Sequence, residues 1–212
     1  MAQSLNDPKA FFDACRSSVM GPKLDQREVS GTNDVIGGLD GLPVSWAAYA
    51  LATAWHETAH TMHPVREAYW LSASAAKRYF MRMYDPSGKR PKLARANGNV
   101  RVGDGPKFCG RGYVQLTWAN NYKKAGKRIG VDLYDHPELA LDPNNAALIM
   151  RYGMVEGWFT GRAFKTYLPS SGMAKRSAFY QARRIINGLD KASLIAGYAI
   201  EFQAALVKGK WG

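Results

Sequence analysis

The sequence predicts a mainly α-helical protein with a small irregular or β-containing lobe and a cleft between two lobes. Apolar residues recur at helical spacing through most of the 212 residues, while glycine, proline and other turn formers concentrate in residues 85–112. No internal repeat or long linker is visible, and 46% hydrophobic content is enough for one core. We therefore expect a single domain over residues 1–212, with 85–117 as its small lobe and no separate accessory module.

Two helices are expected to open the chain. Asp7 followed by Pro8 is typical of a helix start, because the carboxylate caps free backbone amides and proline suits the first turn. We expect this helix to end at Gly21. Asp25 is placed to cap a second helix, whose apolar stripe extends to Leu39.

The third helix, from about Ser45, is the most apolar of the chain. Its apolar residues lead toward Glu57, and Pro64 is expected to end it, because proline cannot continue a helix interior. Ser72 or Ser74 then begins a further helix.

The composition changes in the small lobe. Asn97 followed by Gly98 is a hairpin signal. The segment YVQLT, residues 113–117, alternates and contains β-branched residues, so we expect a short strand there. Helices return with Asp142 before a proline, continue over residues 176–187, and end with a helix that Asp190 is expected to cap.

The charge balance is strongly basic. Lys and Arg number 29 against 17 Asp and Glu, a net charge of +12, which favours polyanions such as nucleic acid, anionic lipid or acidic envelope polymers. Two cysteines, Cys15 and Cys109, are too few for a disulfide framework and are expected to be free thiols. No export signal or membrane-spanning stretch is visible, so we expect synthesis in a cytoplasm and no stable membrane insertion.

The segment His56-Glu57-Thr58-Ala59-His60 has the H-E-x-x-H spacing by which helices of metalloproteases hold zinc. A catalytic zinc needs a third protein ligand. No glutamate follows at the expected distance, and His63 is too close in sequence. The pattern is short enough to arise by chance, so we expect no metal and no cofactor, and keep a zinc peptidase or amidase as an alternative.

The same stretch also allows a carboxylate pair. Cleavage of a glycosidic bond needs an acid for the leaving oxygen and a second group for the anomeric carbon or its attacking water. Glu57, near the end of an apolar helix beside Trp55, is placed for partial desolvation, which would raise its pKa and suit a general acid. Glu67 follows Pro64 and can face Glu57 across a groove. The alternative is a buried helix residue at 57 and a surface partner of Arg66 at 67.

Two further stretches, GRGYVQLTWANNY at 110–122 and ARRIINGLD at 182–190, decide between these interpretations. With the H-E-T segment and the second glutamate, they resemble, in the same order, the motifs of the family-19 chitinase-like glycoside hydrolases. In plant-type members of that family the second glutamate lies farther from the first than the ten residues that separate Glu67 from Glu57 here. The stretches around them, from about residue 10 to 207, are similar to the phage and prophage endolysins of that superfamily. The resemblance implies a lysozyme-like helical fold.

The resemblance also implies roles for individual residues. Glu57 would be the general acid and Glu67 the candidate base, with the Thr117 hydroxyl helping to hold the attacking water. The implied substrate-binding residues are Gln115, Asn121, Asn187, Arg111 and Tyr122. Turn-forming or backbone-capping roles are the alternative for the Asn and Gln residues, above all for Asn187 beside a glycine. Four aromatic residues are candidates for stacking on sugars, although core packing is favoured for each: Tyr69, Trp70, Tyr113 and Trp118.

The function implied is that of a phage-type endolysin that cleaves β-1,4 bonds between N-acetylmuramic acid and N-acetylglucosamine of peptidoglycan strands. As a monomer it would wait in the host bacterial cytoplasm until a holin-type membrane permeabiliser releases it to the periplasm and cell wall. A lytic transglycosylase or a chitinase using the same Glu57 is an alternative. Another is a basic nucleic-acid-binding protein acting through loop 85–112, but no nucleic-acid recognition motif appears there, so nucleic acid is not the expected partner.

Overall fold

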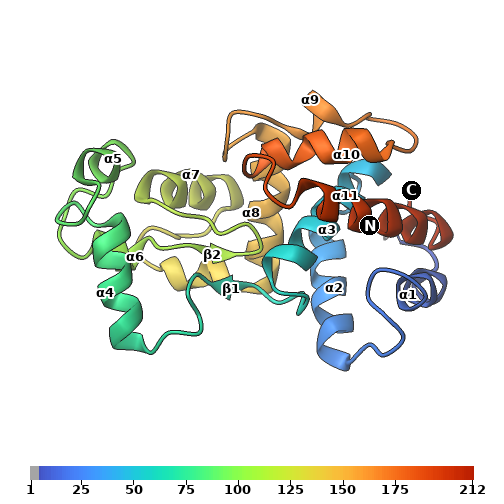
Figure 1. The fold of residues 1–212 in the computed structure, drawn as a ribbon, viewed down its shortest axis with the longest axis horizontal. Coiled ribbons are helices and arrows are strands. Elements are labelled where there is room, and N and C mark those ends of the chain that lie inside the picture. The colour runs from blue at the N-terminus through green and yellow to red at the C-terminus, as the bar shows by residue number, and fades with distance from the viewer. Residues whose placement is uncertain (1–4) are drawn as a thin grey trace. The chain divides into compact units, whose positions relative to one another are not determined.

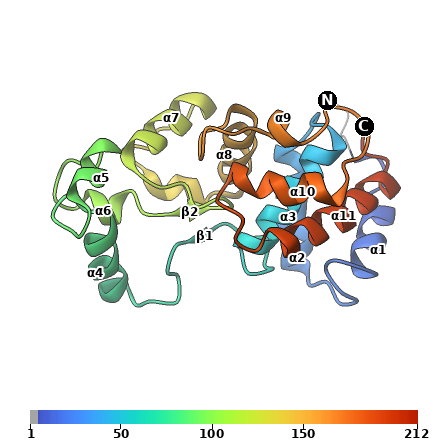
Figure 2. The same ribbon diagram turned by 45° about the horizontal axis from the view of Figure 1, so that its top comes forward.

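The computed structural model describes residues 5–212, and these are mainly helical (Figures 1 and 2). The chain forms two compact units. The first unit comprises the residues up to His63 and those from Met150 to Gly212, and the second unit is Pro64–Ile149. The second unit is therefore wider than the small lobe expected over 85–117.

The first unit is built from helices of both ends of the chain. α11 packs against α3, α10 and α1, as Figures 1 and 2 show. α8 begins in the second unit and ends in the first. The elements are α1 (Pro8–Arg16), α2 (Gln26–Gly38), α3 (Val44–Glu57), α8 (Pro143–Glu156), α9 (Phe164–Tyr167), α10 (Arg176–Ala182), the 3-10 helix η2 (Arg183–Ile185) and α11 (Ala192–Lys208).

Small residues explain how α3 and α11 pack so closely. α3 is buried on almost every side, and its buried residues include Ala47, Ala48, Ala50, Ala52 and Ala54. α11 is likewise rich in buried alanines. A helix that is apolar on all sides belongs in the core of a protein. The position of its last residue, Glu57, is therefore fixed by the packing of α3.

The predicted helix starts at Asp7 and Asp25 are confirmed. Asp7 accepts a hydrogen bond from the backbone of Ala10 at 3.0 Å. Asp25 and Glu28 form a reciprocal capping box with distances of 2.7 and 2.9 Å. α1 ends at Arg16, earlier than the predicted Gly21, because the following residues form turns.

The second unit is more helical than predicted. Its only strands within the described residues are two residues each, and they pair antiparallel, Val65 with Gly112 and Arg66 with Arg111. The elements are β1 (Val65–Arg66), α4 (Ala73–Tyr84), α5 (Pro91–Ala96), α6 (Asp104–Lys107), β2 (Arg111–Gly112), α7 (Ala119–Ile129) and the 3-10 helix η1 (Pro137–Leu141).

The predicted strand 113–117 is wrong. Residues 113–115 form a turn, and Leu116 pairs back onto Arg111 with backbone hydrogen bonds of 2.8 and 3.2 Å. Gln115 has a φ of 53°, a left-handed conformation that no extended strand contains. The β-branched alternation therefore marks a tight loop.

Two other local signals serve different structures from those predicted. Asn97 and Gly98 end α5 instead of forming a hairpin, because a glycine with φ of 88° also suits the residue after a helix. Asp190 does not cap α11; the capping position is Lys191, without a side-chain hydrogen bond.

Both cysteines are buried and free, as expected. Burial raises the pKa of Cys15 to about 12. No helix within residues 5–212 is long and apolar enough to cross a bilayer.

Candidate active site

α3 ends at Glu57, so the predicted end at Pro64 is wrong. The N–H of His60 donates to the carbonyl of Trp55 at 2.8 Å, the arrangement that closes a helix through a left-handed residue. That residue is Ala59, with a φ of 51°. The helix therefore ends without a glycine, and the last residue of α3 is the candidate acid.

This helix end removes the basis for the zinc interpretation. Two histidines four residues apart share one helix face only while the helix continues, and His60, with a φ of 72°, lies beyond the end of α3. Its ring stacks on Trp55 at 4.6 Å, and its Nε2 lies 3.3 Å from the hydroxyl of Tyr198. Residues 5–212 contain no group of three His, Cys, Asp or Glu side chains suited to a metal ion.

Glu57 is held by an arginine that the sequence analysis missed. Nη1 of Arg183 lies 2.8 Å from Oε1 of Glu57; the arginine side chain is 4% exposed and the glutamate 22%. Nε of Arg183 donates to the carbonyl of Asp190 at 3.0 Å, and the N–H of Asn187 donates to the carbonyl of Arg183 at 3.0 Å. The guanidinium therefore reaches Glu57 from a fixed turn.

Glu67 is held by three donors in the second unit. Oε1 accepts from the hydroxyls of Tyr84 at 2.8 Å and Tyr79 at 3.1 Å, and Oε2 accepts from the N–H of Gly110 at 3.3 Å. Burial, followed by the negative charge of Glu67, raises the pKa of both tyrosines, so the phenols keep their protons and donate. The carboxylate is thus oriented as an acceptor.

The alternative of a surface pair between Glu67 and Arg66 does not fit this arrangement. The guanidinium of Arg66 lies over the ring of Phe80, 5.8 Å from its centre. Phe80 belongs to a small apolar cluster against which Tyr79 and Tyr84 also pack. α4 therefore brings both phenols to Glu67 because its apolar face is buried.

The glycine that opens the G-R-G motif is required by space. A Cβ on Gly110 would lie 2.8 Å from Oε1 of Gln115 and 2.9 Å from Oε2 of Glu67. The backbone N–H of Glu67 also donates to the carbonyl of Gly110 at 2.8 Å. A larger residue at this position would therefore have to displace one of these two side-chain ends.

Thr117 and its neighbours form a braced loop. The hydroxyl of Thr117 donates to the carbonyl of Gln115 at 2.8 Å, and Nδ2 of Asn121 donates to the carbonyl of Thr117 at 2.8 Å. Nε2 of Gln115 donates to the carbonyls of Val65 and Gly112, both at 3.1 Å. These side chains hold the backbone in the present structure, and their contacts with a sugar stay a prediction.

The other implied binding residues also make internal bonds. Nη1 of Arg111 donates to the hydroxyl of Tyr122 at 2.8 Å, and that hydroxyl donates to the carbonyl of Cys109 at 2.8 Å. Tyr122 is completely buried, so it presents no surface to a ligand as it lies. Asn187 is exposed and accepts the N–H of Gly188 at 2.8 Å, the turn-forming role considered for it.

Two of the four aromatic candidates lie at the surface. Tyr69 is 57% and Trp70 72% exposed, two and three residues after Glu67, and their rings meet edge to face at 5.3 Å. Core packing, the favoured interpretation, is therefore wrong for this pair. Tyr113 is fully buried, and Trp118 packs against Tyr84.

Backbone strain gathers around the three predicted catalytic residues. Left-handed conformations cost side-chain-bearing residues about 1–3 kcal/mol each and concentrate at functional sites. Eight non-glycine residues among those described adopt them. Six lie within five residues of Glu57, Glu67 or Thr117: Ala59, His60, Met62, Ala68, Gln115 and Trp118.

The predicted residues are divided between the two units. Glu57 and Asn187 belong to the first unit, together with Arg183. The second unit brings together Glu67, Arg111, Gln115, Thr117, Asn121 and Tyr122.

Comparison with known proteins finds similarity to chitinases. A family model described as chitinase class I, of glycoside hydrolase family 19, matches residues 48–168, more than half of the chain. The chain is 37% identical over 65 residues to endochitinase A2 of Pisum sativum, covering 30% of this chain and 19% of the relative. It is 48% identical over 46 residues to endochitinase 1 of Theobroma cacao, covering 21% and 14%. The chain thus spans less than a fifth of these relatives.

Solved structures extend the likeness to the whole fold. Chitinase C from Streptomyces griseus HUT6037 superposes with a TM-score of 0.59 at 18% identity, covering 98% of this chain and 78% of that chain. A mutant of chitinase C gives a TM-score of 0.58 at 19% identity, covering 97% and 78%. The predicted mainly helical, lysozyme-like fold class is confirmed.

Proposed function

Because the chain belongs to glycoside hydrolase family 19, the class I chitinase family, we propose that it hydrolyses β-1,4 bonds between amino sugars with Glu57 as general acid. The observation that carries the proposal is that two glutamates of the matched range are each held by dedicated donors. Arg183 holds Glu57, and Tyr79 and Tyr84 hold Glu67.

The proposed reaction inverts the anomeric centre. Glu57 transfers its proton to the oxygen that bridges the two sugars, and the carboxylate left behind is stabilised by Arg183. Glu67, oriented by three donors, removes a proton from the water that attacks the anomeric carbon, and Thr117 helps to hold that water. Inverting enzymes of this kind need about 6.5–9.5 Å between the two carboxyl groups.

The proposed substrate is the peptidoglycan strand, and the proposed role is that of an endolysin. The net charge of +12 supports an acidic polymer, because stem-peptide carboxylates and envelope phosphates attract a cationic enzyme. In this role a monomeric enzyme leaves the host cytoplasm through a holin-type permeabiliser and acts in the periplasm and cell wall.

Chitin is the second candidate substrate. The observation that favours it is that the related proteins are named endochitinases and a chitinase C. Chitin is neutral, so it leaves the excess of positive charge without a role.

Product analysis decides among these substrates. We expect the protein to release muropeptides with new reducing ends from purified sacculi, detected by mass spectrometry. Anhydro ends would identify a transglycosylase, and activity confined to chitin oligomers would identify a chitinase. Glu57→Gln is expected to lower the rate about 10²–10⁴-fold. Glu138→Gln, at an exposed glutamate that lies 3.4 Å from Nδ1 of His136, is the matched control.

A further inference from the structure

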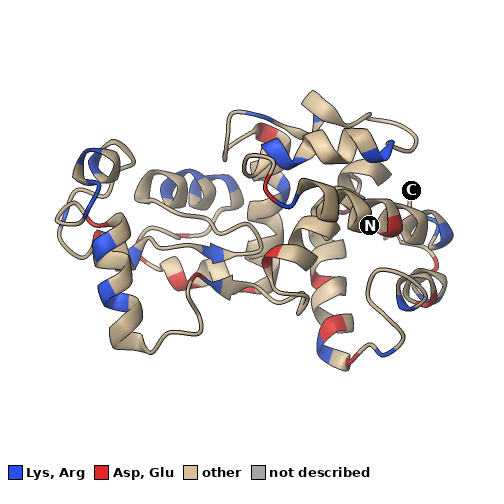
Figure 3. Cartoon of the chain, viewed as in Figure 1, with Lys and Arg blue, Asp and Glu red and all other residues tan. Residues whose placement is uncertain are grey.

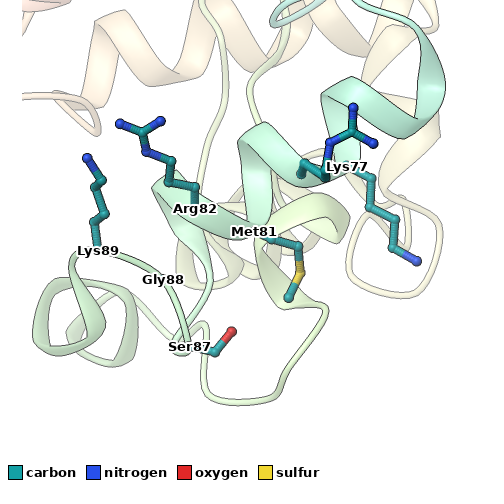
Figure 4. A pocket seen from close by; sticks show the side chains of 7 residues that line it. Lys77, Met81, Arg82, Ser87, Gly88 and Lys89 are labelled. Atoms are coloured by element: carbon teal, nitrogen blue, oxygen red, sulfur yellow. The ribbon is translucent and has the colours of Figure 1, made fainter.

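The second unit contains an open pocket of about 550 Å³ between α4 and the loop that follows it (Figure 4). Four cationic side chains line this pocket, together with one apolar and one hydroxyl side chain: Lys77, Arg78, Arg82, Lys89, Met81 and Ser87. In Figure 4 the side chains of Arg82, from the helix, and Lys89, from the loop, extend in the same direction.

α4 separates this pocket from the candidate base. At 100° per residue, Ala76, Tyr79 and Phe80 share one face, which packs into the apolar cluster beside Glu67. Lys77, Arg78 and Arg82 lie on the opposite face and are exposed. A helix with its side chains is about 10–12 Å across, so about one helix diameter separates the pocket from Glu67.

The loop that forms one wall of the pocket is held against α4. The N–H of Lys89 donates to the carbonyl of Arg82 at 2.9 Å. A Cβ on Gly88 would collide with the carbonyl oxygens of Met81 and Arg82, so the loop approaches the helix more closely than a larger residue would allow. The backbone of Lys89 is thereby fixed beside α4.

Cationic residues outnumber acidic ones in this region. Residues 68–103 contain eight Lys or Arg and one acidic residue, Asp85. The carboxylate of Asp85 is buried and already accepts from the Ser87 hydroxyl at 2.6 Å and the N–H groups of Gly103 and Gly105 at 2.8 and 3.1 Å. Although burial acts to raise it, these hydrogen bonds lower the pKa of Asp85. Figure 3 shows Lys and Arg along α4 and α5.

We propose that this pocket binds the acidic groups of an acidic glycan, the carboxylates or phosphates carried along the sugar polymer that the enzyme cuts. The proposal rests on the proposed function and makes the preferred substrate an acidic glycan in place of neutral chitin. The planar guanidinium groups of the arginines can form paired hydrogen bonds with a carboxylate or a phosphate, and the lysines add positive charge. Met81 and the aliphatic stems of the cations offer an apolar floor to the linking groups.

Binding of the full chain to insoluble glycans tests the proposal. The pocket variant combines Lys77→Gln, Arg78→Gln, Arg82→Gln and Lys89→Gln, and every protein compared also carries Glu57→Gln so that the polymer is not consumed. We expect the pocket variant to lose about tenfold in affinity for sacculi, with a weaker dependence on salt than the parent. Its affinity for chitin stays unchanged.

A variant of equal net charge provides the control. Lys23→Gln, Arg27→Gln, Arg162→Gln and Lys165→Gln also lower the net charge by four, at exposed positions away from the pocket. We expect this variant to keep affinity for sacculi within about twofold. Far-ultraviolet circular dichroism and thermal unfolding of both variants verify that they fold. Should the pocket variant fail to fold, the four single substitutions replace it, and each must weaken binding to sacculi more than the corresponding control substitution.

Treated sacculi identify the source of the negative charge. Removal of the stem peptides by an amidase takes away carboxylates, and hydrofluoric acid takes away phosphate-linked groups. The treatment that abolishes the difference between parent and pocket variant names the ligand. Equal losses of affinity for sacculi in the pocket and control variants would overturn the proposal. A pocket variant that loses affinity for duplex DNA but not for sacculi would overturn it as well. If the parent without Glu57→Gln hydrolyses no glycan while the pocket variant still loses affinity for sacculi, the proposed function fails and the pocket inference stands.

Discussion

Arg183 joins the end of α3 to a turn that lies 126 residues further along the chain, through a distance of 2.8 Å between its Nη1 and Oε1 of Glu57. The arginine side chain is 4% exposed, whereas the glutamate keeps 22%. The two ends of this ion pair are thus unequal, since water can reach the carboxylate but scarcely the guanidinium. Removing the glutamate leaves a buried cation, and removing the arginine leaves a carboxylate with some solvent.

Glu57→Ala is therefore expected to destabilise the protein by about 2 kcal/mol, below the range for fully buried pairs because Glu57 is partly exposed. Glu57→Gln should cost less, because its amide oxygen still accepts from Arg183. Urea unfolding of both variants measures the difference. Equal stabilities of Glu57→Ala and the parent would contradict the structural importance of the pair.

The two phenols on Glu67 predict a pH dependence at the alkaline end. Burial raises the pKa of Tyr84 and Tyr79 above 10.0 in the folded state. Above about pH 10 the unfolded chain then loses protons that the folded chain keeps, so stability falls as pH rises. Tyr84→Phe should make this loss of stability with pH smaller. Thermal unfolding between about pH 9 and 11 measures the effect.

Replacing the two tyrosines by phenylalanine is also expected to change the activity. Tyr84→Phe and Tyr79→Phe each remove one donor from Oε1 of Glu67, so the carboxylate is less firmly oriented. We expect kcat to fall about tenfold for each and more for the double variant, with KM nearly unchanged. Tyr180→Phe is the control, because Tyr180 is remote in sequence and belongs to the first unit. Full activity in the double variant would argue against Glu67 as a base.

Much of the fold was predictable because its signals are local. Asp7, Asp25 and Ser72 each cap a helix through an amide three residues away, so the residue type and its position are sufficient. The end of α3 was not predictable in this way. It depends on Ala59 in a left-handed conformation, and alanine carries no signal for that conformation.

In the candidate site, too, some features could be predicted from the sequence and others could not. Glu57, Glu67 and Thr117 stand in recognisable motifs, whereas their partners are chosen by packing. Arg183 and Arg184 are adjacent in sequence, and only the fold turns the first one inward. The tyrosines that bind Glu67 come from α4, 12 and 17 residues away, where the periodicity marks burial but not a hydrogen bond to a carboxylate.

The histidines predict the response to chelators. Because α3 ends at Glu57 and the ring of His60 stacks on Trp55, we expect EDTA to leave hydrolysis unchanged. His60→Ala should keep most of the activity and lose only the stacking energy, about 1 kcal/mol in unfolding experiments. Loss of activity in EDTA followed by recovery with zinc would restore the metal hypothesis.

Gly110 provides the most local test of the candidate base. In Gly110→Ala the new methyl group meets Oε2 of Glu67 at 2.9 Å and Oε1 of Gln115 at 2.8 Å, so one of these side chains must move. Displacing a catalytic carboxylate by about 1 Å is expected to lower kcat about 100-fold. Gly197→Ala is the matched control, because a Cβ there has open space and alanine favours the helix interior of α11. Steady-state hydrolysis of sacculi, with thermal unfolding alongside, measures both variants. A Gly110→Ala protein that folds and retains the parent's kcat would show that the position of Glu67 does not limit the reaction.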